Sequence, residues 1–252
     1  MVPVLRVEHL QKIYGSQRAV EDVSFEIGRG EIFGIVGANG AGKTTTIECL
    51  VGLQKPSGGS ISVLGLDPQR DAAALRQRIG IQLQQAALPD RLRVIEALEL
   101  FASFYPKPVA TQTLLEQWGL REKRNAAFAS LSGGQKQRLF IALSLINDPE
   151  IVFLDELTTG LDPQARRQTW ELIGAIRQRG KTVVLVTHFM EEVERLCDRI
   201  AVIDRGRVVA LDTPDRLIAT LQQEWHRTPQ KPAAAPAATF EDVFLSLTSN
   251  RA

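Results

Sequence analysis

The chain has 252 residues, 44% of them hydrophobic, and its 30 Lys and Arg residues against 29 Asp and Glu residues give a formal net charge of +1. This length and apolar content suffice for one large α/β domain, or for a core domain with a smaller insertion. The near-zero net charge argues against a protein that coats nucleic acid, so we expect no nucleic-acid partner.

Cysteine usage and hydropathy indicate a cytosolic protein. Cys49 and Cys197 lack metal-ligand spacing, and we expect both to be reduced. The N-terminus alternates like a strand and does not have the layout of a signal peptide. No window approaches the ~20 apolar residues that a membrane-spanning helix needs. If the protein works at a membrane, another chain must cross that membrane.

The first part of the chain is predicted to form strands. The sequence favours strands over residues 4–7, 19–27 and 32–36. Tyr14 lies between the first two of them. An aromatic residue at that point either packs in the core or presents its ring to a nucleotide base, and its position alone leaves both open.

A phosphate-binding loop is predicted directly after the third strand. Residues 37–44 contain a glycine, four residues and then Gly-Lys-Thr, followed by an apolar-periodic helix. Glycines let backbone N–H groups approach phosphates, and the positive end of the helix points at the same place. Lys43 is then placed to reach the β- and γ-phosphates, and the Thr44 hydroxyl to ligate Mg²⁺. The residues assigned to this nucleotide site are Gly37, Asn39, Gly40, Ala41, Gly42, Lys43, Thr44 and Thr45.

The middle of the chain changes from mixed to helical character. A turn is followed by a short strand over residues 61–65, a helix over 71–78 and a strand over 79–84. From about residue 86 to residue 145 the apolar spacing is helical. We therefore expect a helical subdomain inserted into an α/β core.

Strands and helices alternate again after that insertion. The predicted elements are strands over 151–155 and 182–188, helices over 163–178 and 190–197, a hairpin around Arg205 and Gly206, and a helix over 213–221. This alternation predicts an α/β fold with a mostly parallel sheet covered on both faces. We assign residues 1–222 to this domain, 223–239 to a Pro/Ala-rich linker and 240–252 to a short C-terminal helix.

Two carboxylates follow the apolar strand 151–155. Asp155 is placed to hold Mg²⁺ and Glu156 to polarise a water for attack on the γ-phosphate. Adjacent carboxylates are usually a solvated pair, but the continuous apolar strand before them favours the catalytic interpretation. His188 closes the next predicted strand, where it is either an ordinary structural residue or a group that orients the same water.

The string LSGGQKQR, residues 131–138, predicts a second helix start suited to phosphate, without a lysine like that of the first loop. An ordinary N-cap of serine and glycine explains the local structure but not the whole string. With this string the chain resembles the ATP-binding cassette (ABC) family over essentially its whole length. The resemblance implies a P-loop NTPase fold in which a mostly parallel core carries an antiparallel β subdomain and the inserted helical subdomain.

The resemblance also implies roles for individual residues. Tyr14 matches the aromatic that stacks on adenine, and Gln84 matches the glutamine that touches Mg²⁺ and the attacking water and senses the membrane partner. Gln82 and Gln85 lie close enough to compete for the role of Gln84. Leu157 stands where many family members have proline. The remaining matches are the signature Ser132, Gly133, Gly134 and Gln135, the magnesium ligand Asp155, the catalytic Glu156, the interface residue Asp162 and the switch residue His188.

The partners follow from the same resemblance. It implies a head-to-tail dimer around two ATP molecules with Mg²⁺, formed by two copies or by a close paralogue, and a separate transmembrane permease. The protein would then be peripheral, at the cytoplasmic face of the membrane. The string DELTTGLDP, the short helical subdomain and the terminal helix most resemble ABC-2-type exporters. The alternative is a soluble ABC-type ATPase acting on DNA, ribosomes or Fe–S assembly.

Overall fold

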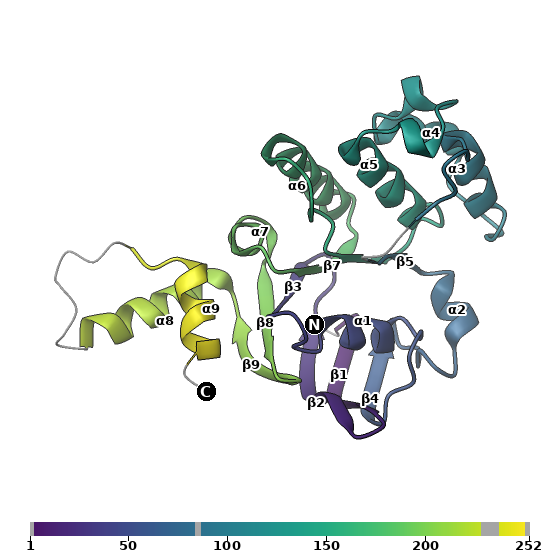
Figure 1. Cartoon of the computed structure of the whole chain (residues 1–252). Helices are drawn as coiled ribbons and strands as arrows, with labels where there is room; N and C mark the ends of the chain where they lie inside the picture. Colours follow the sequence, from purple (N-terminus) through teal and green to yellow (C-terminus); the bar gives the residue numbers. More distant parts are fainter. Residues whose placement is uncertain (1–2, 84–86, 228–236, 250–252) are drawn as a thin grey trace.

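The computed structural model describes residues 3–83, 87–227 and 237–249. In these residues one nine-stranded sheet runs in the order β4-β1-β2-β9-β8-β3-β7-β6-β5, with helices on both of its faces (Figure 1). The strands are β1 (Leu5–Tyr14), β2 (Gln17–Ile27), β3 (Ile32–Val36), β4 (Gly58–Val63), β5 (Ile79–Gln82), β6 (Ile151–Asp155), β7 (Thr182–Thr187), β8 (Arg199–Asp204) and β9 (Arg207–Asp212).

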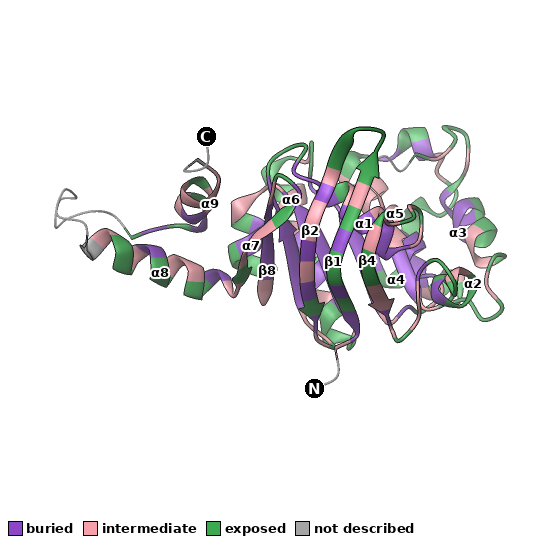
Figure 2. Ribbon diagram, turned by 90° about the horizontal axis from the view of Figure 1, so that it is seen from below, coloured by how far each residue is buried: buried purple, intermediate pink, exposed green. Residues whose placement is uncertain are grey.

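The sheet has a parallel part and an antiparallel part, as the sequence predicted. Strands β8, β3, β7, β6 and β5 pair in parallel, whereas β1 pairs antiparallel with both β2 and β4. In Figure 2 buried and more exposed residues alternate along much of the antiparallel strands, because about every second side chain faces the core. The inner parallel strands β3, β6 and β7 are buried at every residue.

Both faces of the parallel part contribute to a core. Along β6, Val152 and Leu154 belong to one apolar cluster, while Ile151 and Phe153 belong to the other. The helices that follow β5 cover the first face, and α1 and the antiparallel strands cover the second (Figure 1). The helices are α1 (Lys43–Leu50), α2 (Ala72–Arg76), α3 (Val94–Ala102), α4 (Thr111–Gln117), α5 (Gly133–Ser144), α6 (Pro163–Gln178), α7 (Met190–Leu196), α8 (Pro214–Arg227) and α9 (Phe240–Ser249).

The helical insertion lies where the sequence placed it, between β5 and β6. Helices α3, α4 and α5 gather at one end of the molecule (Figure 1). Trp118, directly after α4, is 1% exposed and belongs to the same apolar cluster as α6 and α7. The insertion therefore shares its core with the sheet.

Several boundaries differ from the sequence prediction, including those of β2, which begins at Gln17, and of β4, which runs over Gly58–Val63 in place of 61–65. Strand β1 extends to Tyr14, so Tyr14 ends a strand; the outer half of β1 is largely exposed and has no apolar alternation to mark it. Helix α2 is shorter than the predicted 71–78. Helix α8 continues to Arg227, so residues 223–227 of the predicted linker are helical; Trp225 lies one turn beyond the buried Leu221 and packs against the same core.

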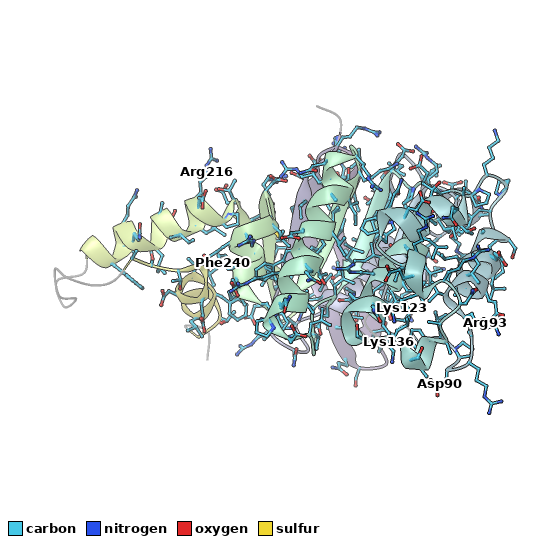
Figure 3. All side chains as sticks on the ribbon, turned by 90° about the horizontal axis from the view of Figure 1, so that it is seen from above. Asp90, Arg93, Lys123, Lys136, Arg216 and Phe240 are labelled. Carbon is cyan, nitrogen blue, oxygen red and sulfur yellow. The ribbon has the colours of Figure 1, made fainter. Side chains whose placement is uncertain are left out.

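The C-terminal helix begins at the predicted residue, Phe240. Phe240 is fully buried, and its backbone N–H donates to Glu194 Oε1 of α7 at 2.6 Å. Helix α9 contacts α7 and α8, at the end of the molecule opposite Arg93 (Figure 3). Residues 250–252 of the predicted helix and 228–236 of the predicted linker lie outside the described residues.

Strand β5 packs closely on the end of α5, which predicts that a methyl group added at Gly80 destabilises the fold. A Cβ at Gly80 would lie 1.9 Å from the backbone oxygen of Ser144. We expect Gly80→Ala to lower the free energy of unfolding by roughly 3 kcal/mol, because neither backbone segment yields without repacking. Urea unfolding followed by circular dichroism measures this. Gly174→Ala in α6 is the control, since its Cβ meets nothing within 4 Å and we expect a gain of about 0.5 kcal/mol. Equal stability of Gly80→Ala and the parent would contradict the close contact.

Candidate functional site

The predicted phosphate loop joins β3 to α1 and needs its glycines for shape. Gly42 has φ +104, and a Cβ there would lie 2.5 Å from the backbone oxygen of Ala19. A Cβ at Gly37 would lie 2.3 Å from the backbone oxygen of Ile203. A side chain at either position would therefore clash with β2 or β8 and displace the loop. The space in which the loop would hold phosphate would then change shape.

Lys43 lies inside this loop. Its ammonium donates to the backbone oxygens of Gly37 at 2.8 Å and Ala38 at 3.0 Å, and the residue is 6% exposed. Burial lowers the pKa of Lys43, while the nearby Glu156 and Asp155 oppose that shift. The loop therefore holds a buried positive charge next to two carboxylates.

Asp155 ends β6 as a buried carboxylate without a hydrogen-bonding partner. It is 1% exposed, and neither carboxyl oxygen has a partner among the described residues. Burial raises the pKa of Asp155 to about 6; Glu156 adds to the shift and Lys43 opposes it. A buried carboxylate is costly unless it is paired, and a divalent cation is a ligand that would pair it.

Glu156 and His188 are brought together by neighbouring strands. Each follows a strand end, on β6 and β7, and the two strands pair in parallel. Glu156 Oε1 lies 3.2 Å from Nδ1 of His188, at ion-pair distance but outside hydrogen-bonding geometry. Glu156 has φ +48, a left-handed conformation that costs energy for any residue with a Cβ. Its backbone N–H donates to the oxygen of Val186 at 2.9 Å, which fixes this turn to β7.

Most of the predicted nucleotide-site residues line one cavity of about 740 Å³. The predicted residues that line it are Tyr14, Asn39, Gly40, Gly42, Lys43, Thr44, Thr45, Glu156 and His188. Tyr14 is 41% exposed, and Lys12 Nζ lies 4.7 Å from its ring centroid. Gln17, Arg18, Ala19 and Thr159 also line the cavity. The sequence analysis did not predict these four residues. Only Thr159 could have been suspected from the sequence, because it lies three residues after the predicted catalytic Glu156.

The signature residues line a different cavity of about 530 Å³. Ser132 caps α5: its Oγ accepts from the N–H of Gln135 at 3.3 Å, and Gln135 Oε1 accepts from the N–H of Ser132 at 3.0 Å. Asp162 caps α6 and accepts from the N–H of Ala165 at 2.9 Å. Arg138, Gly119 and Gln168 were not predicted and also line this cavity; Arg138 lies inside the recognised string. The two cavities share no lining residue.

The other predicted site residues have these positions. Gly37 and Ala41 lie in the phosphate loop, and Asp155 precedes Glu156, although none of them lines the cavity. Gln84 lies outside the described residues. Gln82 is 7% exposed, and its side-chain amide donates to the oxygen of Leu83 at 3.0 Å.

Comparison with known proteins gives the family. The family model described as ABC transporter matches residues 20–159. The chain belongs to this family. It is 45% identical over 221 residues to the Nod factor export ATP-binding protein I of Ralstonia nicotianae, covering 86% of this chain and 69% of that protein. It is 42% identical to the protein of the same name from Paraburkholderia xenovorans, covering 86% and 73% of the two chains.

Solved structures agree with that assignment. An ATP-binding subunit of an ABC transporter superimposes with a TM-score of 0.81 at 29% identity, covering 97% of this chain and 99% of that one. A dimeric ATP-binding cassette in a post-hydrolysis state, bound to ADP and phosphate, has a TM-score of 0.74 at 28% identity, covering 83% and 98%. The chain is therefore an ATP-binding, ATP-hydrolysing subunit of an ABC transporter with the P-loop NTPase fold.

Transporter ATPases of this family dimerise and work with membrane permease components. Among the described residues of this chain, every helix is too short or too polar to cross a membrane.

The raised pKa of Asp155 predicts how stability depends on pH. Because that pKa is about 6 in the folded protein against an ordinary 3.8, the folded state binds the proton more tightly than the unfolded chain. The stabilisation by this proton is present at low pH and is lost as pH rises through about 6. We expect Asp155→Asn to gain about 3 kcal/mol relative to the parent between about pH 4 and pH 7. Urea unfolding in chelator-treated, nucleotide-free buffer measures the gain, and a constant difference across this range would contradict the assignment.

Proposed function

We propose that this chain powers export by closing head to tail on a second cassette, either an identical copy or a close paralogue. The observation that supports this is the pair of separate cavities on one chain. The first has the phosphate loop, Lys43 and the Glu156–His188 pair, whereas the second has the start of α5 and Asp162. Two chains facing each other would place the second cavity of one over the nucleotide of the other.

The roles within each composite site follow from the chemistry of the groups. Lys43 binds the β- and γ-phosphates in exchange for its carbonyl contacts in the loop. Glu156 takes the proton of the attacking water, and His188 orients that water or the γ-phosphate. The ring of Tyr14 stacks on the base, and the N–H groups at Gly133 and Gly134 meet the γ-phosphate of the partner's nucleotide.

Mg²⁺ fits the residues present at this site. The Thr44 hydroxyl and the unpartnered carboxylate of Asp155 would hold it, with Gln84 as the third predicted ligand. When bound, the ion neutralises charge that develops on the phosphates. The buried Asp155 carboxylate then gains the partner that it lacks in the described residues.

The proposed permease contact is an apolar groove between β5 and α3. A cavity of about 520 Å³ is lined by Leu83, Leu88, Phe101 and Tyr105, among others. Phe104, at the end of α3, is 63% exposed. An apolar groove of this kind suits a short helix of a membrane protein, and such a contact would hold the chain against the cytoplasmic face of the membrane. The names of the relatives support export, and the Nod factor in those names is the first candidate substrate to test. The soluble alternative has no specific observation in its favour.

Glu156→Gln tests the composite site. The amide keeps the shape of the side chain but cannot accept the water proton, so we expect hydrolysis to fall more than about a hundredfold while ATP binding remains. The variant should then elute from gel filtration as a dimer in the presence of ATP. Lys43→Ala is the control and should bind no ATP and stay monomeric. A Glu156→Gln protein that binds ATP and remains monomeric would contradict the scheme.

Site-directed crosslinking tests the permease. We expect a photoactivatable thiol reagent on Arg93→Cys, five residues after Leu88 of the groove, to crosslink to a polytopic membrane protein in cells. Arg216→Cys, on α8 at the opposite end of the molecule (Figure 3), is the control and should not. Background labelling is low because burial raises the pKa of the Cys49 thiol to about 11 and Cys197 is also buried. Ribosomal or DNA-bound products at Arg93→Cys would favour the soluble alternative.

A further inference from the structure

One buried carboxylate outside the recognised motifs joins the two turns of the catalytic pair. Glu192, on α7, is 1% exposed. Its Oε1 accepts hydrogen bonds from Trp170 Nε1 at 3.0 Å and from the Thr158 hydroxyl. Its Oε2 accepts from the Thr187 hydroxyl at 2.5 Å. The three donors come from α6, from the turn after β6 and from the end of β7.

The two threonines flank the proposed catalytic residues. Thr158 lies two residues after Glu156, and Thr187 immediately precedes His188. The Thr187 oxygen also accepts from the backbone N–H of Phe189 at 3.0 Å, so the turn is held on both sides of His188. Glu192 therefore accepts hydrogen bonds from both turns, through threonines that lie within two residues of the proposed catalytic residues.

The hydrogen bonds to the Glu192 carboxylate resist separation of the two turns. A buried carboxylate is tolerated only when donors surround it, and removal of one donor leaves an expensive unsatisfied charge. If either turn moved away, Glu192 would lose a donor. Glu156 also has a strained left-handed backbone, which persists only where neighbouring structure holds it.

Helix α7 is itself held from the other side. Glu194, two residues after Glu192, accepts the backbone N–H of Phe240 at 2.6 Å, and α9 packs on α7. The carboxylate of Glu192 is therefore presented from a helix fixed between the core and the C-terminal helix.

We propose that Glu192 is a positioning residue for ATP hydrolysis. It fastens the Glu156 turn to the His188 turn, and so keeps the carboxylate and the imidazole 3.2 Å apart. The inference rests on the roles proposed above for Glu156 and His188. Small displacements of catalytic groups cost large factors in rate, whereas nucleotide binding by the phosphate loop does not depend on this link.

The test separates turnover from binding. We expect Glu192→Gln, Thr158→Val and Thr187→Val each to lower kcat about tenfold or more, with the KM for ATP and the Kd of a fluorescent ATP analogue within about twofold of the parent. Thr158→Ser and Thr187→Ser keep the hydroxyl and should recover most of the rate. Glu191→Gln is the matched control, because Glu191 is exposed on the same helix. Thermal unfolding of each variant reports its folding, and the two Thr→Val variants carry the test if Glu192→Gln does not fold.

The outcomes distinguish this inference from the proposed function. If Glu156→Gln is inactive while folded Glu192→Gln and both Thr→Val variants hydrolyse ATP at the parental kcat, the positioning role is overturned and the proposed function stands. Loss of nucleotide binding in step with kcat would also overturn it, since the link would then serve general folding. Parental turnover by Glu156→Gln would remove the proposed catalytic role and the inference with it.

Discussion

Charge buried at the carboxyl ends of the parallel strands is the constraint on which the rest of this structure depends. Lys43, Asp155 and Glu156 lie together where β3 and β6 end, and Asp155 has no hydrogen-bonding partner among the described residues. Such an arrangement is expensive in an isolated chain, and polyphosphate with the proposed Mg²⁺ would compensate these charges. The apolar strands and the two cores around them hold the charged groups close together at this edge of the sheet.

The same chain carries a second and incomplete site for phosphate. The start of α5, with its Ser132 cap, presents the backbone N–H groups of a first helical turn, but the cavity around it lacks the phosphate loop and the Glu156–His188 pair. Each cavity thus has groups for binding or hydrolysing a nucleotide that the other cavity lacks, and within one chain the two cavities share no lining residue. Family membership and the dimeric post-hydrolysis relative make head-to-tail pairing the simplest way in which both would serve one nucleotide.

Support for the catalytic groups comes from residues outside the motifs. Glu192 accepts hydrogen bonds from the turn after β6 and from the end of β7. The helix that carries Glu192 is joined to α9 by the hydrogen bond from the backbone N–H of Phe240 to Glu194. The C-terminal helix, which a Pro/Ala-rich segment separates from the cassette in sequence, therefore packs on the same element as the switch turn. In the positioning role proposed for Glu192, the geometry of the site would depend on these long-range contacts as well as on the recognised strings.

The sequence by itself determined the mostly parallel α/β fold, and it marked the phosphate loop, the carboxylate pair and the signature as the candidate site, because each depends on a short string or a local periodicity of apolar residues. The C-terminal helix beginning at Phe240 was predictable for the same reason. Only the tertiary structure decided the full length of β1 with Tyr14 at its end, the extension of α8 to Trp225 and beyond, and the cavity wall formed by residues 17–19. It also revealed Glu192, since a hydrogen-bond network among residues 158, 170, 187 and 192 joins distant parts of the chain and leaves no periodic mark on any of them.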